Sequence, residues 1–516
     1  MSEMITSYLA NMSMGFFMDQ LAVTLILFIF GFMLNNCLCR GKVNTLEILL
    51  AFPTGLSVYS LVSFLILILD LPFNRVSVTG ICSLIAVICV LLTDRLGATA
   101  YTGGLPGKKI AIYLITVLCI AVISTSGLLS VSVSNDSLYY YWMYPRAMVE
   151  YEHLRPQFDV FLTDVGQTGA ILNTLPFMYG FNENFGIQTF FGINTLLTVI
   201  YALYKNACAR LEKKPAIIST LILSALLICT QPFVIMLKWT MSNGYFMCFM
   251  FMAVYTACEY GRSDRMDISD GGVRGRLIIA GILMTQMSML RMEGIMIALI
   301  LVLCFVPLEY KNTELAAAFL MPMFICSLAY SIRIFIIFRV DAPYTFLTPK
   351  KAFIQLSSIA LVAVYVLLIR GRRADFAGRH IKLLLPLALI GVNGILFFMN
   401  KTLYLENVSA FIKNISGRSG WGLFPMYLIA CYVLVFIVGA KEGDHKPEIT
   451  FWDMCFICYF LASLAVCFAR EDALRESIGD SGNRVLMQGT LLAFFAAADH
   501  ITGLILPPLI EDAAGN

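Results

Sequence analysis

The stretch FWDMCFICYFLASLAVCF (451–468) contains one charged residue in 18. An apolar helix of about 20 residues is long enough to cross the roughly 30 Å hydrocarbon core of a bilayer. Comparable runs recur along the chain, of which 59% is hydrophobic and 13% is charged. Soluble domains carry about 25% charged residues. Because the runs are continuous rather than alternating, the sequence predicts an all-α polytopic membrane protein and not a β-barrel.

The apolar runs predict about 13–15 transmembrane helices. They are expected near 18–38, 46–70, 76–94, 110–131, 185–204, 215–236, 242–260, 277–290, 293–309, 314–338, 353–369, 383–400, 421–440, 451–469 and 485–507. The pair 277–290 and 293–309 forms either two short helices or one long tilted helix. We expect N-terminal transmembrane helices in 1–131, an external loop with interfacial or re-entrant helices in 132–184, and a C-terminal transmembrane bundle in 185–516.

Loop charge predicts the orientation of the chain. With fifteen spans, most of the 36 basic residues fall in short loops on one side, including the run RGRRADFAGRHIK (370–382). The positive-inside rule makes that side cytoplasmic. The segments 132–168, 339–351, 400–420 and 470–484 are then external. We therefore expect a multi-pass protein of the cell (plasma) membrane with an external active face and a cytoplasmic C-terminus.

The polar segment SNDSLYYYWMYPRAMVEYEHLRPQFDVFLTDVGQTG (134–169) interrupts this apolar sequence. Asp136 lies just after the expected end of the fourth span, where partial burial makes a carboxylate more basic. Aromatic side chains at this depth commonly form an interfacial belt. Three acids, an arginine and aromatic rings are also what a carbohydrate site uses. The candidate substrate-binding residues of this segment are Tyr140, Tyr141, Arg146, Asp159 and Asp164.

A second candidate site is SMLRMEGIM (288–296), where Arg291 and Glu293 lie between two expected spans on the outer side. Ionisable groups at membrane depth are costly and often functional. The pair is either part of a substrate site or a local ion pair that closes a tight helical hairpin, with Gly294 permitting the bend.

A third candidate site is the last external loop, REDALRESIGDSGNRVLMQG (470–489). Arg484 stands at the start of the final span, where an arginine can bind a lipid-linked phosphate through two parallel hydrogen bonds. It is equally well placed to be an ordinary anchor at the membrane boundary. Lys350 and Lys351 are a weaker alternative for the phosphate.

Together these segments resemble the GT-C class of polytopic glycosyltransferases, especially bacterial members similar to the protein-mannosyltransferase and aminoarabinose-transferase families. The residues 135–137, 140–141 and 145–146 look like that family's external loop pattern WDSxxYHxxR. The turn 290–294 is similar to its TKNEG-like turn, and 480–484 is similar to its arginine before the last helix. The family's usual histidine is absent, and Tyr141 or Trp142 stands in its place.

The resemblance implies an inverting glycosyltransferase that moves a sugar from a polyprenyl-phosphate donor to a glycan, lipid or protein acceptor. Asp136 would be the general base on the acceptor hydroxyl. Arg484 or a lysine would hold the donor phosphate. Asp159 or Asp164 would bind the acceptor or a divalent cation. The sequence shows no required cofactor, no Rossmann-type domain for a soluble nucleotide sugar, and no sign of a nucleic-acid partner.

Two alternatives remain open. A cell-surface polysaccharide polymerase is also polytopic and uses arginines to handle lipid-linked sugars. A flippase or transporter of lipid-linked oligosaccharides is not an enzyme, and transporters usually place ionisable groups within their helices. Here the main such residue is Arg333, with Glu47 at a span edge.

Overall fold

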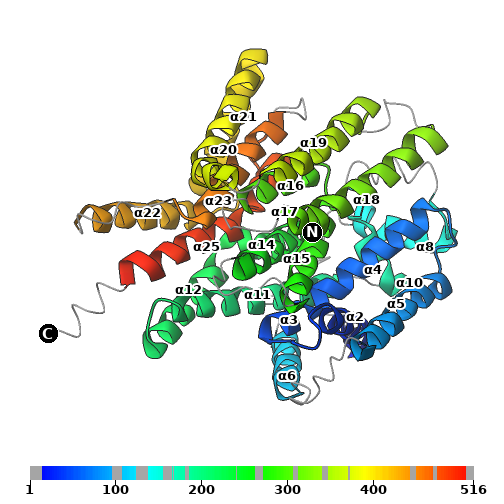
Figure 1. Cartoon of the computed structure of the whole chain (residues 1–516). Helices are drawn as coiled ribbons and strands as arrows, with labels where there is room; N and C mark the ends of the chain where they lie inside the picture. Colours follow the sequence, from blue (N-terminus) through cyan, green and yellow to red (C-terminus); the bar gives the residue numbers. More distant parts are fainter. Residues whose placement is uncertain are drawn as a thin grey trace. The chain divides into compact units, whose positions relative to one another are not determined.

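The computed structural model describes residues 14–95, 107–123, 138–154, 166, 168–180, 185–239, 241–261, 271–305, 312–339, 347–369, 372–441, 449–468 and 474–506. These residues form α-helices joined by short turns (Figure 1). They form two compact units: Met1–Thr198 with Leu237–Ala374, and Val199–Met236 with Asp375–Asn516. We call these unit 1 and unit 2. The expected division at 131 and 184 stays a prediction.

In the described part of the chain, eight helices are long and apolar enough to cross a membrane. A ninth follows if α12 (Lys213–Cys229) and α13 (Gln231–Lys238), which meet at 63°, are one broken span. A polytopic α-helical membrane protein is therefore confirmed. Other expected spans are shorter helices, such as α6 (Gly107–Ile123) and α16 (Gly294–Phe305), so the total of about 13–15 crossings stays a prediction.

Unit 1 contains closely packed helices at its core. α2 (Met14–Leu38) packs against α4 (Ala51–Ile68), and α14 (Ser242–Gly261) packs against α15 (Gly271–Met289) (Figure 1). A Cβ atom on Gly31 would lie 1.8 Å from the carbonyl oxygen of Ala51, and one on Gly55 would lie 2.0 Å from that of Leu27. Only glycine allows the α2 and α4 backbones to come this close.

The other elements of unit 1 complete the bundle. They are α3 (Thr45–Leu49), α5 (Arg75–Arg95), α8 (Tyr144–Tyr151), α10 (Leu175–Met178), α17 (Asn312–Leu315), α18 (Met321–Ser331) and α19 (Pro349–Leu368), while α11 (Phe185–Cys208) runs from unit 1 into unit 2. In the expected external loop (132–184), the described residues 168–180 include a 3₁₀ turn (Ile171–Asn173) just before α10. Its residues Ile171 and Leu172 are fully buried, so protein surrounds this turn. Its depth in a membrane stays a prediction.

Unit 2 is built around α25 (Thr490–His500), whose side chains are buried throughout. α22 (Phe424–Lys441) and α23 (Phe451–Phe468) pack against it, and α24 (Ser481–Met487) leads into it. Most of α20 (Arg372–Met399) also belongs to this unit. α21 (Lys401–Lys413) lies in the segment 400–420 that was expected to be an external loop. Its buried Asn407 accepts a hydrogen bond from the backbone of Leu474 at 2.9 Å.

Ion pairs connect charged residues that lie far apart in the sequence. In unit 1, Arg276 pairs with Glu47 at 2.9 Å. In unit 2, Arg210 pairs with Asp499 at 2.8 Å. Arg333, the ionisable residue expected within a span, is buried and pairs with Asp70 at 3.1 Å at the end of α4. The side of the membrane on which each pair lies stays a prediction.

Candidate functional site

The turn between α15 and α16 gathers polar side chains in unit 1. Arg291 Nε donates to Glu293 Oε1 at 2.5 Å, and both side chains are largely buried. The turn is tight because a Cβ atom on Gly294 would lie 2.4 Å from the carbonyl oxygen of Ser288. The chain therefore forms two packed helices here, closed by a local ion pair, and not one long helix.

Arg291 also reaches the start of α14. Its Nη1 donates to Asn243 Oδ1 at 3.0 Å and lies 3.4 Å from Ser242 Oγ. The hydroxyl of Tyr141 donates to the same Ser242 Oγ at 2.8 Å. Tyr141 lies in a π-helical turn (Tyr139–Met143) before α8 and is 3% exposed. Two candidate segments of the sequence thus meet at Ser242. We call Tyr141, Ser242, Asn243, Arg291 and Glu293 the hairpin cluster.

The later part of the expected external loop (132–184) packs against the same turn. Gly166 has φ +91°, and a Cβ atom there would lie 2.0 Å from the carbonyl oxygen of Leu290. The backbone N–H of Thr168 donates to the Met289 carbonyl at 3.0 Å, and Gln286 Nε2 donates to the Thr168 hydroxyl at 3.1 Å. The end of the loop is therefore held beside the hairpin cluster.

The other candidates of the external segment have different positions. Arg146 is exposed on α8, where it pairs with Glu150 at 2.8 Å and stacks over Trp142 at 5.7 Å. Tyr140 stacks on Tyr144 with ring centroids 6.0 Å apart. These described contacts are local to α8 and the turn before it.

The three acids of the segment, Asp136, Asp159 and Asp164, lie outside the described residues. Their proposed roles therefore stay predictions. Among the residues that the structure describes, no three His, Cys, Asp or Glu side chains are grouped to hold a metal ion. Binding of a divalent cation by Asp159 or Asp164 is untouched by that observation.

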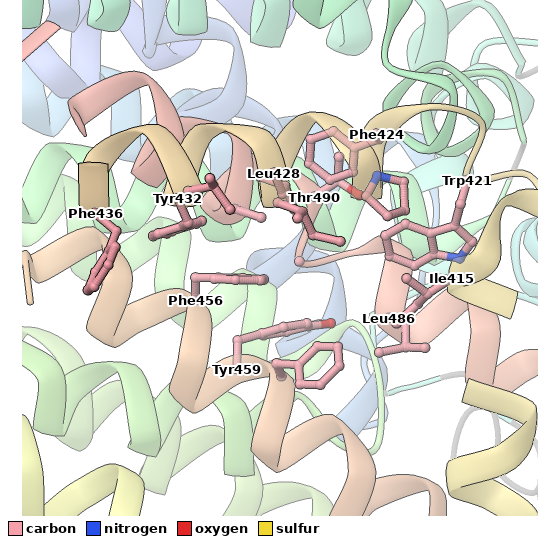
Figure 2. Close-up of a pocket in the computed structure, with 16 residues that line it drawn as sticks. Ile415, Trp421, Phe424, Leu428, Tyr432, Phe436, Phe456, Tyr459, Leu486 and Thr490 are labelled. Carbon is pink, nitrogen blue, oxygen red and sulfur yellow. The ribbon is translucent and has the colours of Figure 1, made fainter. Parts of the chain in front are cut away.

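Unit 2 contains an elongated groove of about 550 Å³ (Figure 2). One wall is a stripe along α22 whose side chains recur every three or four residues, the spacing of one helix face. That stripe consists of Phe424, Pro425, Leu428, Ile429, Tyr432, Val433 and Phe436. Phe456 and Tyr459 of α23 face it, and Trp421 and Leu486 lie at one end (Figure 2).

Every hydrogen-bonding side chain that lines the groove is bonded to protein. The hydroxyl of Tyr432 donates to Asp453 Oδ1 at 2.6 Å, and that of Tyr459 donates to the Val485 carbonyl at 2.5 Å. Trp421 Nε1 donates to Asn483 Oδ1 at 2.8 Å. The hydroxyl of Thr490 donates to the Met487 carbonyl at 2.6 Å. The inner surface of the groove is therefore suited to hydrocarbon, because a polar ligand group would find no ready partner there.

Arg484 lies on α24, two residues before Leu486, which lines the groove. The loop around it is well ordered by hydrogen bonds: Asp480 caps α24 by accepting from the backbone of Gly482 at 2.9 Å, and Asn483 Nδ2 donates to the carbonyls of Ser419 and Ser477 at 3.0 Å. Arg484 itself is partly buried. Its helix contributes Leu486 to the groove wall, and Arg484 belongs to unit 2, whereas the hairpin cluster belongs to unit 1.

The hairpin cluster includes two residues that the sequence did not single out, Ser242 and Asn243. The sequence SNG (242–244) at the start of α14 looks like any other helix start, so no local pattern marks these residues. Comparison with known proteins adds no family to this geometry: the chain matches no protein-family model, no curated protein and no solved structure.

Proposed function

We propose that this chain is a membrane glycosyltransferase that takes a sugar from a polyprenyl-phosphate donor and passes it to a glycan, lipid or protein acceptor on the external face of the cell membrane. One observation carries the proposal. An apolar groove in unit 2 is lined in part by α24, the short helix that also carries Arg484. That combination suits a ligand with a long hydrocarbon chain and an anionic headgroup.

The shape of the groove supports a linear occupant. Its α22 wall runs from Phe424 to Phe436, which is roughly 18 Å of helix. The rim is open, because Ile429 is 65% exposed and Phe436 is 69% exposed. A chain can therefore enter sideways from the bilayer. Lipid tails are as apolar as the groove. A hydrocarbon chain that moves from the bilayer into the groove therefore gains little hydrophobic free energy. Affinity must then depend on packing along the groove and on the phosphate–arginine contact.

In this proposal Arg484 stabilises the negative charge that builds on the phosphate as the sugar leaves. Asp136 removes the proton from the acceptor hydroxyl, and the acceptor attacks the anomeric carbon with inversion. The hairpin cluster offers hydroxyl, amide, carboxylate and guanidinium groups for hydrogen bonds to a sugar or acceptor. Tyr140, Arg146, Asp159 and Asp164 are further candidates for that role. No cofactor is required, and a divalent cation at Asp159 or Asp164 is an optional addition.

A polysaccharide polymerase is the second candidate. The observation that favours it is that two partly buried arginines, Arg291 and Arg484, are each fixed by ordered surroundings. Such an enzyme transfers a whole repeat unit and needs both arginines without needing Asp136. The third alternative, a flippase, moves the lipid-linked sugar without breaking a glycosidic bond.

The test of the groove is equilibrium binding of polyprenyl phosphate to the full chain in phospholipid nanodiscs. We expect saturable binding that excess bilayer phospholipid does not compete away. Arg484→Gln should weaken it at least tenfold, because the phosphate loses its cation. Arg475→Gln is the matched control: it removes the same charge from an exposed side chain in the same loop and should leave binding unchanged. Equal binding by Arg484→Gln and the unmodified chain would contradict the proposal.

A further inference from the structure

Tyr432 lines the groove with its ring and hydrogen-bonds outside the groove with its hydroxyl. Its ring is part of the groove wall on α22 (Figure 2), while its hydroxyl donates to Asp453 Oδ1 at 2.6 Å. The hydroxyl is therefore turned out of the groove and into a polar network. Without that acceptor, the groove would contain a phenol hydroxyl with no partner on the ligand side.

The Asp453 carboxylate is positioned by several further contacts. Its Oδ2 accepts from the backbone N–H of Thr450 at 2.8 Å and from the hydroxyl of Thr450 at 2.9 Å. His500 Nε2 lies 2.8 Å from the same oxygen. Asp453 is 5% exposed and His500 is 4% exposed. The ring of Tyr432 packs edge-on against His500 with centroids 5.5 Å apart.

The charged and titratable groups around His500 come from several elements. They are Asp453 on α23, Tyr432 and Cys431 on α22, and Asp499 on α25, with Arg210 beyond Asp499. Asp499 pairs with Arg210 at 2.8 Å. Of these two ion pairs, the Asp453–His500 pair is hydrogen-bonded to a residue that lines the groove, Tyr432.

We propose that Asp453 and His500 are positioning residues that keep the hydroxyl of Tyr432 out of the groove, so that the groove can hold a bare hydrocarbon chain. This inference rests on the proposed function, because the chain in question is that of the polyprenyl-phosphate donor. It assigns a role to the most deeply buried ionisable pair of the described part of unit 2, which lies apart from Arg484 and Asp136 in the sequence.

A purely structural role makes a different prediction. Asp453 also caps the start of α23 through Thr450. If Asp453 acted only as a helix cap, loss of its carboxylate would destabilise unit 2 whether position 432 held tyrosine or phenylalanine. If the carboxylate acts through Tyr432, removal of the tyrosine hydroxyl should cancel the effect on ligand binding. The two roles are separated by a double-mutant cycle.

The experiment measures the dissociation constant of polyprenyl phosphate for the full chain in nanodiscs. Asp453→Leu removes the acceptor with little change of shape, and it should raise the dissociation constant about tenfold, since an unpaired hydroxyl then faces hydrocarbon. Tyr432→Phe should bind within about twofold of the unmodified chain. The double variant Asp453→Leu/Tyr432→Phe should bind as Tyr432→Phe does. Asp499→Leu is the matched control, because it removes a buried carboxylate from the Arg210–Asp499 pair. It should leave the dissociation constant unchanged.

Two outcomes overturn the inference while leaving the proposed function intact. One is that Asp453→Leu binds as tightly as the unmodified chain. The other is that the double variant binds as weakly as Asp453→Leu, which would place the loss in the folding of unit 2. Failure of the unmodified chain to bind polyprenyl phosphate at all would overturn both proposals together.

Discussion

At the scale of single residues, Arg291 and Glu293 form a largely buried ion pair in the turn between α15 and α16. The sequence left a choice between a substrate site and a local ion pair that closes a hairpin. The structure shows the ion pair and also connects Arg291 to Ser242 and Asn243. The pair was predictable because its members are two residues apart. The bond from Tyr141 to Ser242 was not, because 101 positions separate them and no local pattern marks either partner.

Glu293→Gln should therefore destabilise the protein. The glutamate side chain is 3% exposed and that of Arg291 is 12% exposed, so the change removes the negative charge that Glu293 supplies to a buried guanidinium. Loss of one member of a buried pair typically costs about 3 kcal/mol. Thermal unfolding in detergent should show the loss, with Glu150→Gln as the control. Glu150 belongs to an exposed pair with Arg146, for which about 0–1 kcal/mol is expected. Equal shifts for the two variants would contradict the burial argument.

At the scale of elements, helix existence was predictable and helix pairing was not. The expected spans 421–440 and 451–469 appear as α22 and α23 because apolar length alone predicts them. The groove between them depends on which face each helix presents. An aromatic and aliphatic stripe along α22 has the same sequence pattern whether it faces lipid or a ligand, so the groove could not be predicted from the sequence. α21 was missed because its polar residues are typical of a loop.

Close packing of α2 on α4 depends on glycine. Gly55→Ala should separate the two helices, because the new Cβ would lie 2.0 Å from the carbonyl oxygen of Leu27. Overpacking of this kind costs about 1–3 kcal/mol. Gly80→Ala on α5 is the matched control, since a Cβ there meets nothing within 4 Å. The unfolding temperature of Gly80→Ala should be unchanged or slightly raised, because alanine has a higher helix propensity than glycine. A Gly55→Ala variant as stable as Gly80→Ala would show that the α2–α4 contact is looser than described.

At the scale of the whole molecule, composition was enough to predict a polytopic α-helical membrane protein. It was not enough to predict two compact units, because their boundaries fall within α11, α13 and α20 rather than in loops. The candidate functional residues also fall into both units. The hairpin cluster belongs to unit 1, while Arg484 and the groove belong to unit 2. We propose that donor binding depends on unit 2 and that acceptor binding depends on unit 1.

We propose that the chain breaks the glycosyl–phosphate bond of the donor and forms a glycosidic bond to the acceptor, with Asp136 as the base. The most direct measurement is sugar transfer in proteoliposomes, with lipid-linked sugars extracted from a strain that lacks this protein as the donor pool. We predict that the unmodified chain consumes a polyprenyl-phosphate sugar and releases polyprenyl phosphate, and that Asp136→Asn, folded in the membrane, does not. Full transfer by Asp136→Asn would contradict the account, as would movement of the intact lipid-linked sugar across the bilayer with no bond broken.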